Sequence, residues 1–305
     1  MDLLLYVPAR LLVWIAQLLP LGLVARVGRL TGRLVYMFDA RHRRVTIQNL
    51  TNAFGEEMSE SAILNLAKEN FRRIGEGFAC AIKTMSMSED QIDRVLKMEG
   101  MDQFRDEKDA DPPQSRVFAI GHFGNFEIYA RSNGLPKRAR SAATYRALRQ
   151  PSLNRLHGEL RSRSGCLFFE RRHDARKLKA AMQQGGLYLG LLCDQHAGDR
   201  GLRLPFFGRE CSVSAAPAVF ALRYDCPLHV VICHREAIAR WRIHFHEPIP
   251  THVDGMPRES EAIMRDVNAE LEEAIRQDPA NWFWVHNRWK PAKKKKQKKA
   301  PSTSE

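Results

Sequence analysis

The most informative part of the sequence is Val117-Phe118-Ala119-Ile120-Gly121-His122-Phe123-Gly124-Asn125-Phe126-Glu127. Its first four residues form an apolar run that predicts a buried strand, and Gly121 lets the backbone turn as it leaves the sheet. Gly124-Asn125 predicts the start of a helix, with Asn125 as the N-cap. α/β enzymes hold their reacting groups at such turns, at the carboxyl ends of strands. The stretch therefore predicts an α/β fold with a site directly after this strand.

Two titratable side chains, His122 and Glu127, stand five positions apart in this stretch. Histidine is the natural general base near neutral pH, and a nearby carboxylate can orient its ring and stabilise the imidazolium. The motif contains no serine or cysteine that could act as a nucleophile. The pair therefore predicts a general base, His122, that activates a hydroxyl of the substrate, with Glu127 as the orienting carboxylate.

The spacing His-x4-Glu, with Gly-Asn inside it, resembles the motif of the glycerolipid and lysophospholipid acyltransferase superfamily. The longer run, residues 121–127, is most similar to the bacterial lipid A late acyltransferase branch, the lauroyl and myristoyl transferases, which often have Trp in place of Phe126. A second motif, Pro279-Ala280-Asn281-Trp282-Phe283-Trp284-Val285-His286-Asn287-Arg288-Trp289, resembles the closing signature of the same branch. Two distant motifs thus indicate one family, and the resemblance covers most of residues 25–290.

Further matches lie between the two motifs in the same order. The resemblance implies that arginines of residues 145–165 meet the phosphate of the acceptor lipid, a task that suits the bidentate guanidinium group. A second apolar run, residues 187–192, predicts another buried strand that ends in the family's Asp-Gln pair. Phe206-Phe207-Gly208 is expected to pack a loop or to line an acyl groove. The candidate substrate-binding residues are Asn125, Arg146, Arg163, Asp194, Gln195 and Arg288.

Alternating strand-like and helix-like segments after residue 94 predict one α/β catalytic domain with a mixed central sheet flanked by helices. We expect strands at residues 95–98, 117–120, 142–145, 167–169, 187–192, 228–233 and 241–246. We expect helices at residues 126–132, 152–163, 174–183, 215–224 and 258–276. The tryptophans of the closing motif are predicted to close the core, although Arg288 and His286 could still face the site.

Other chemistries receive less support from the residues. Cys193 stands beside Asp194, but it ends an apolar strand, where cysteine behaves as a small hydrophobe rather than as a nucleophile. His244 and His246 share one face of a strand, and no third metal ligand is placed by spacing. The glycines form neither a Walker loop nor a dinucleotide fingerprint. We therefore predict no cofactor and no metal. The six cysteines without paired spacing favour reduced thiols facing a cytoplasm.

The N-terminal segment, residues 1–30, is the predicted membrane anchor. Its apolar residues 3–5 and 11–24 are interrupted by Pro8, Arg10, Gln17 and Pro20. A helix over residues 11–24 would be about 21 Å long at ~1.5 Å per residue, whereas a bilayer core is about 30 Å thick. A single span that begins at residue 3 and an interfacial or re-entrant anchor remain equal alternatives. Six arginines between residues 26 and 44 predict that the body of the protein, residues 31–290, lies on the cytoplasmic side of the membrane. The resemblance implies that this membrane is the cell inner membrane.

The net charge of +13 and the pI near 9.7 favour anionic partners. The Lys-rich segment within residues 291–305 predicts a disordered tail, and it lacks the aromatics and the fold of a nucleic-acid binder, so no nucleic acid is expected. An anionic membrane surface is the better partner for the tail. For the body, the resemblance implies acyl carrier protein as acyl donor and a lipid A precursor, or another anionic glycolipid, as acceptor.

The predicted function is therefore transfer of a fatty acyl group to a lipid A precursor, with His122 as base. Two alternatives remain: an acyltransferase of the same superfamily with another acceptor, such as a phosphoglycolipid or aminolipid, and a non-catalytic membrane lipid-binding protein. The His–carboxylate pair argues against the second, because a binding module has no need of a general base.

Overall fold

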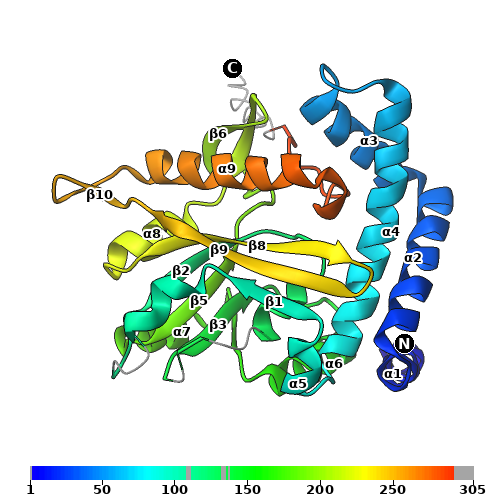
Figure 1. The fold of residues 1–305 in the computed structure, drawn as a ribbon, viewed down its shortest axis with the longest axis horizontal. Coiled ribbons are helices and arrows are strands. Elements are labelled where there is room, and N and C mark those ends of the chain that lie inside the picture. Colours follow the sequence, from blue (N-terminus) through cyan, green and yellow to red (C-terminus); the bar gives the residue numbers. More distant parts are fainter. Residues whose placement is uncertain (1, 108–110, 132–134, 137, 292–305) are drawn as a thin grey trace, which may run out of the picture.

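The computed structural model describes residues 2–107, 111–131, 135–136 and 138–291, which are built around a seven-stranded sheet (Figure 1). Five strands run in one direction, and β9 and β1 run in the other. The seven predicted strands and the mixed α/β class are confirmed. Across the sheet the strands are β1 (Leu96–Glu99), β9 (Arg240–Ile249), β8 (Leu228–Ala237), β2 (Arg116–Ile120), β5 (Leu187–Leu192), β3 (Arg140–Tyr145) and β4 (Leu167–Glu170).

Strand β5 and residues 117–120 of β2 are continuous apolar runs, as is typical of parallel strands that are covered on both faces. Every residue of β2 is buried, and Leu187 and Leu189 of β5 are 0 % exposed. Helices α8 (Ala216–Arg223) and α9 (Ser260–Gln277) pack against β2, β8 and β9, and α7 (Ala175–Gln183) packs against β4. The central strands therefore form a rigid support for the loops at their ends.

The helices α1 (Asp2–Leu18), α2 (Leu21–Phe38), α3 (Ala40–Phe54), α4 (Glu60–Thr84) and α5 (Glu89–Asp93) precede the first strand. Of these, α2 and α4 lie antiparallel and side by side (Figure 1). Glycines allow this close approach: a Cβ at Gly32 would lie 2.1 Å from the carbonyl oxygen of Phe71, and one at Gly75 would lie 2.2 Å from that of Gly28. The pair α2–α4 therefore forms one unit beside the sheet.

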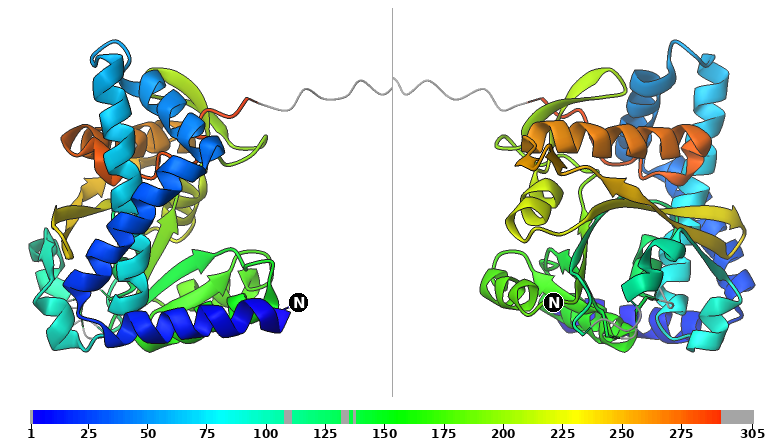
Figure 2. Two further views of the ribbon diagram at one scale, coloured as in Figure 1. Left: turned by 90° about the vertical axis from the view of Figure 1, so that its right-hand side faces the viewer. Right: turned by 60° about the vertical axis from the view of Figure 1, so that its left-hand side comes forward.

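The N-terminal apolar stretch is divided between two helices, because α1 ends at Leu18 and α2 begins after Pro20. Figure 2 shows α1 at a large angle to α2. Among the described residues, we find no helix whose length and hydropathy suffice to cross a membrane. Both helices nevertheless expose large apolar side chains, namely Leu4, Leu5, Val7, Leu11, Leu12, Trp14, Ile15 and Leu18 of α1 and Leu23, Val27, Leu30, Leu34, Val35, Met37 and Phe38 of α2. The anchor itself stays a prediction, and its expected boundary at residue 30 falls within α2.

Four of the five predicted helices are confirmed, as α6 (Pro151–Arg161), α7, α8 and α9. The fifth, expected at residues 126–132, is instead a 3₁₀ helix, η2 (Phe126–Arg131), and its last residue lies outside the described part. Asn125 stands directly before η2, but the predicted side-chain cap is wrong: its Nδ2 donates to Thr84 Oγ1 of α4 (3.3 Å), and its buried Oδ1 accepts no hydrogen bond from the described residues. The remaining 3₁₀ helices are η1 (Met101–Glu107), η3 (Ser162–Ser164) and η4 (Pro279–Asn281).

Two short hairpins, β6 (Leu202–Phe206) with β7 (Arg209–Val213) and β10 (His252–Val253) with β11 (Met256–Pro257), were not predicted. In the first, Phe207 and Gly208 have φ of 49° and 67°, the left-handed pair that closes a two-residue hairpin. Phe206 and Phe207 are buried against Trp282 and Trp284, so the expected packing role of Phe206-Phe207-Gly208 is confirmed. The predicted Lys-rich tail lies outside the described residues from residue 292 onward.

Candidate functional site

The strands β2 and β5 are neighbours in the sheet, and the chain leaves them in opposite directions across the sheet. From β2 the chain continues to β3 and β4 beyond β5, whereas from β5 it continues to β8 on the far side of β2. Such a switch point creates a crevice at the carboxyl ends of the strands, where α/β proteins bind their ligands. The register pairs Ile120 with Leu192, so His122 and Asp194 stand opposite each other at this point.

Asp194 accepts hydrogen bonds from both the backbone and the ring of His122. The backbone N–H of His122 donates to Oδ2 (2.8 Å), and the ring Nδ1 donates to Oδ1 (2.7 Å). The indole Nε1 of Trp282 also donates to Oδ2 (2.8 Å). Because the proton on Nδ1 points at the carboxylate, the lone pair lies on Nε2, which is the nitrogen that a general base uses.

The environment of Asp194 keeps its carboxylate ionised. The residue is 1 % exposed. Burial alone would raise its pKa, but the charge of His122 and the hydrogen bonds from His122 and Trp282 lower the pKa to about 2. A fixed negative charge of this kind stabilises the imidazolium that forms when histidine takes a proton.

Glu127 does not occupy the place predicted for it. Its carboxylate accepts two hydrogen bonds from Arg161 of α6, at 2.5 and 3.0 Å, and Nε2 of His157 lies 3.7 Å from it. Burial would raise the pKa of Glu127, but His157 and Arg161 lower it to about 2. The expectation that Glu127 orients the His122 ring is therefore corrected: Asp194 makes that contact, and Glu127 joins η2 to α6.

Aromatic side chains enclose the ring of His122. The Phe126 ring packs edge-on at 4.8 Å between centroids, and the Phe283 ring stacks at 5.7 Å. On the other side, the turn at Gly121 is crowded, since a Cβ there would lie 2.5 Å from the Phe123 ring. A larger residue at this position would have to displace the buried Phe123 ring, so the packing favours glycine. The ring is thus fixed by a carboxylate and by two apolar walls.

Two cavities with largely apolar walls share Phe78 with the small pocket that contains His122. The larger, of about 430 Å³, lies along α2 and α4 and has Gly28, Gly32 and Val35 among its walls. It shares Phe78 and Phe283 with the small pocket that contains His122. The second cavity, of about 190 Å³, continues past Phe78 to the polar group formed by Glu127, His157 and Arg161. Each is suited to a hydrocarbon chain whose reacting end lies at His122.

The side chain of Gln195 reaches the proton-accepting nitrogen of His122. Its Nε2 lies 3.3 Å from Nε2 of the histidine. Since Nδ1 of His122 carries the proton, the amide is the donor in this contact. Gln195 is therefore a hydrogen-bond donor beside the point where a substrate hydroxyl would approach the base.

The closing motif, residues 279–289, holds the loop that carries Asp194 and Gln195. Arg288, 0 % exposed, donates from Nη1 to the backbone carbonyls of Gln195 (2.7 Å) and Ser212 (2.9 Å). His286 accepts at Nε2 from the backbone N–H of His196 (3.1 Å). The predicted substrate-binding residue Arg288 thus contacts protein backbone at the site.

Amide side chains of the N-terminal helices fix the closing motif in turn. Asn49 of α3 donates from Nδ2 to the carbonyls of Trp284 (2.8 Å) and His286 (2.7 Å). Asn70 of α4 does the same for Ala280 and Trp282. With Trp282 and Trp284 2 % and 0 % exposed, the predicted core-closing role of the tryptophans is confirmed. Neither asparagine stands in a motif, so sequence reasoning did not find them.

The other predicted substrate-binding residues lie in different surroundings. Arg146 is exposed in the loop after β3. Arg163 is exposed in η3, where its backbone carbonyl accepts a hydrogen bond from Arg131 (3.2 Å). Asn125 is 1 % exposed and faces α4. Their roles toward a substrate stay predictions. Two arginines that were not among the predicted binding residues line the neighbouring pockets, Arg73 beside His122 and Arg161 beside Glu127.

The cysteine alternative is disfavoured by the surroundings of Cys193. Burial raises the pKa of its thiol to about 12, so the nucleophilic thiolate is scarce at neutral pH. All six cysteines are unpaired, and five of them are buried. Within the described ranges, His, Cys, Asp and Glu form no cluster of three or more that could hold a metal ion.

Residues 6–291 match the family described as bacterial lipid A biosynthesis acyltransferase. The chain belongs to this family, and it is an acyltransferase that transfers groups other than amino-acyl groups. It is 23 % identical over 287 residues to the lipid A biosynthesis palmitoleoyltransferase of Escherichia coli (strain K12), covering 91 % of this chain and 88 % of that protein. It is also 23 % identical to the lipid A biosynthesis lauroyltransferase of the same organism over 283 residues, with the same shares covered. The resemblance seen in the motifs is confirmed.

Proposed function

We propose that the protein transfers a fatty acyl group from the thioester of an acyl carrier protein to a hydroxyl of a lipid A precursor. The family and the printed names of the relatives support an acceptor of the lipid A class. The mechanism rests on one observation, the 2.7 Å hydrogen bond between His122 Nδ1 and Asp194 Oδ1. This bond makes Nε2 the nitrogen that takes a proton.

In the proposed reaction, His122 removes the proton from the acceptor hydroxyl through Nε2. The hydroxyl oxygen attacks the thioester carbon, so a carbon–oxygen bond forms and the carbon–sulfur bond breaks. The thiolate leaves and takes the proton back from His122, and Asp194 stabilises the imidazolium in between. Gln195, whose Nε2 lies 3.3 Å from the histidine Nε2, donates to the oxyanion of the intermediate.

Glu127 acts in this scheme as a positioning residue. Its bonds to Arg161 hold α6 against η2, directly after the motif that carries His122. Arg161 and His157 stand at the polar end of the smaller cavity, where they face the acceptor's head group. The larger cavity along α2 and α4 receives an acyl chain.

The proposed location is the cytoplasmic face of the cell inner membrane. The exposed apolar side chains of α1 and α2 would rest in the interface between head groups and acyl chains, as amphipathic helices do. Arg26, Arg33, Arg41 and Arg44 are exposed near them and would meet anionic head groups. The larger cavity lies along α2 and α4, so an acyl chain would enter it directly from the lipid phase.

The test is transfer of a radiolabelled acyl group from acyl carrier protein to a sugar-bearing, tetraacylated lipid A precursor. We expect transfer by the wild-type protein and its loss in His122→Ala. Full transfer by His122→Ala would contradict the mechanism. No transfer by a folded wild-type protein would contradict the acceptor or the donor, and phosphoglycolipid and aminolipid acceptors would be tested next.

A further inference from the structure

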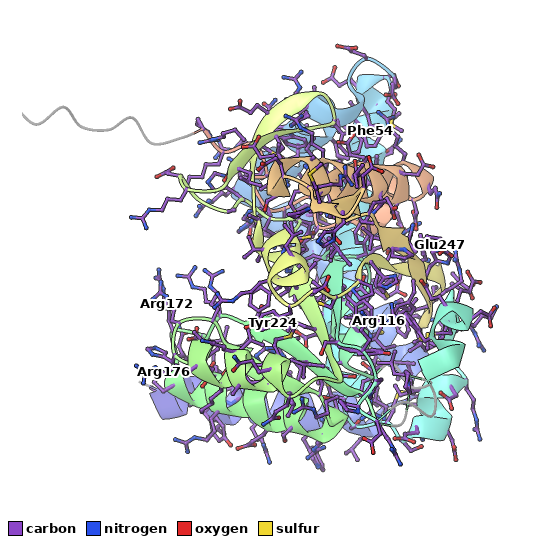
Figure 3. All side chains as sticks on the ribbon, turned by 90° about the vertical axis from the view of Figure 1, so that its left-hand side faces the viewer. Phe54, Arg116, Arg172, Arg176, Tyr224 and Glu247 are labelled. Atoms are coloured by element: carbon purple, nitrogen blue, oxygen red, sulfur yellow. The ribbon has the colours of Figure 1, made fainter. Side chains whose placement is uncertain are left out.

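Arginines gather on two loops at the carboxyl edge of the sheet. Residues 145–183 contain ten Lys and Arg against three Asp and Glu, a difference of seven positive charges. Arg149 follows β3, Arg171 and Arg172 follow β4, and Arg176 stands in the first turn of α7; all four are exposed. Figure 3 shows Arg172 and Arg176 on the same side of the molecule. We call these four arginines the basic surface.

A buried carboxylate, Glu170, builds this surface. It is 6 % exposed, and its Oε2 accepts from the backbone N–H groups of Arg172 (2.7 Å) and His173 (3.0 Å). Burial would raise its pKa, but these bonds and one from the backbone of Ala147 lower it. Since Ala147 lies in the loop after β3, one side chain ties both basic loops together. The arginines are therefore presented by a fixed backbone.

The acidic residues of residues 145–183 already form ion pairs or hydrogen bonds within the protein. Glu159 pairs with Arg10 of α1 (2.6 Å), and Asp174 accepts from the Glu170 backbone N–H (2.9 Å) and pairs with Lys177 (3.0 Å). Together with Glu170, these are all the carboxylates of residues 145–183. The positive charge of the basic surface is thus left for an external partner.

We propose that the basic surface docks the acidic carrier protein that delivers the acyl group. The proposal rests on the proposed function and assigns the place at which the donor binds. Strands β2, β5, β3 and β4 are parallel neighbours, so their carboxyl ends share one edge. At ~4.8 Å between strands, β4 lies about 14 Å from β2. A carrier docked there stands beside the edge that holds His122 and Asp194, within reach of a flexible thioester-bearing arm.

A soluble acidic protein fits this surface better than a bilayer does. The helices α1 and α2 intermix arginines with many exposed large apolar side chains, as an interfacial segment requires. The loops of the basic surface expose one such side chain, Leu148. Exposed charges without a cavity around them act mainly on the rate of encounter with an oppositely charged protein.

The experiment compares Arg172→Glu/Arg176→Glu with wild type, and uses Arg223→Glu/Arg265→Glu as a control with the same charge change on the exposed surface of α8 and α9. Binding of fluorescently labelled acyl carrier protein is titrated at 50 and 200 mM salt, separately from acyl transfer. We expect Kd and KM for the acyl carrier to rise at least tenfold in the first variant, with kcat unchanged. We also expect its salt dependence to flatten, and the control to stay near wild type.

Two further measurements separate the explanations. Binding to vesicles that contain anionic phospholipid should be unchanged in Arg172→Glu/Arg176→Glu; a loss there with an unchanged Kd for the carrier would show a lipid site and overturn the proposal. Equally weakened carrier binding in both double variants would show that only the net charge matters, and it would also overturn the proposal. Carrier binding is measured directly, so weaker binding in Arg172→Glu/Arg176→Glu supports the docking surface whatever the acceptor is. Absence of acyl transfer to the lipid A precursor by the wild-type protein would contradict only the proposed function.

Discussion

The two carboxylates predicted near His122, those of Asp194 and Glu127, differ in what they contact. Asp194 comes from a loop 72 positions away and bonds both the ring and the backbone of the histidine, whereas Glu127 is five positions away and bonds α6. The sheet explains the first contact, because β2 and β5 are adjacent and in register. The 3₁₀ helix that follows Gly124 explains the second, because it brings Phe126 against the ring and directs Glu127 to Arg161. Proximity along the chain is thus a weaker guide than adjacency in the sheet.

The largest expected effect is that of Asp194→Asn. The amide cannot stabilise the imidazolium and favours the wrong tautomer, so we expect kcat to fall on the order of a thousandfold or more, with KM little changed. Single-turnover acyl transfer at saturating donor measures this. If Asp194→Asn kept more than a tenth of the wild-type kcat, Asp194 would not assist the proton transfer. Glu127 would then again be the candidate for the carboxylate that assists His122.

The matched change Glu127→Gln should cost less in kcat and more in substrate binding. It leaves Arg161 with a neutral partner in a mostly buried site, so we expect about 1–3 kcal/mol lower stability and a KM for the acceptor raised about tenfold. The double variant with Arg161→Met should restore part of the stability, because no unpaired charge remains. Equal losses of kcat in Glu127→Gln and Asp194→Asn would break the comparison between the two carboxylates.

The sequence was sufficient for the parts of the fold that local pattern determines. Strands such as residues 187–192 are short, continuous apolar runs that end in polar residues, and this pattern identifies them. His122 follows from the turn at Gly121 and from the strand before it. Asp194 was also found as a polar residue at a strand end, although its partner was not.

What the sequence did not reveal depends on contacts between distant segments. The hydrogen bond from Trp282 to Asp194 joins residues 88 positions apart. The bonds from Asn49 to the closing motif span 235 and 237 positions, and those from Asn70 span 210 and 212. Nothing in a single asparagine marks it as a support for a catalytic loop. Arg161 was missed for a similar reason, since five arginines within residues 146–163 share one composition and only the helix direction of α6 selects the one that meets Glu127.

A smaller effect is expected where the closing motif holds the catalytic loop. Arg288→Met fills most of the same volume but leaves the carbonyls of Gln195 and Ser212 without their donor, so we expect about 2 kcal/mol lower stability and a fewfold lower kcat. Urea unfolding and acyl transfer measure the two quantities, with Arg265→Met on the exposed face of α9 as the control. An unchanged kcat together with the stability loss would show that the loop keeps its geometry without Arg288.

The smallest effect concerns pH and distinguishes His286 from Asp194. Burial, with the charges of His122 and Arg288, lowers the pKa of His286 from 6.5 to about 4. The unfolded chain therefore takes up a proton below pH 6.5 that the folded chain resists until about pH 4, so stability is fully present above 6.5 and declines between these values. His286→Asn should reduce this slope. His234, whose pKa is also lowered to about 4, should keep the rest together with His196 and His244, whose pKa values burial lowers as well. Asp194 contributes its own loss only below pH 4, because its pKa is lowered from 3.8 to about 2. Urea midpoints from pH 7 to 4 test the assignment, and an unchanged slope in His286→Asn would place the titration elsewhere.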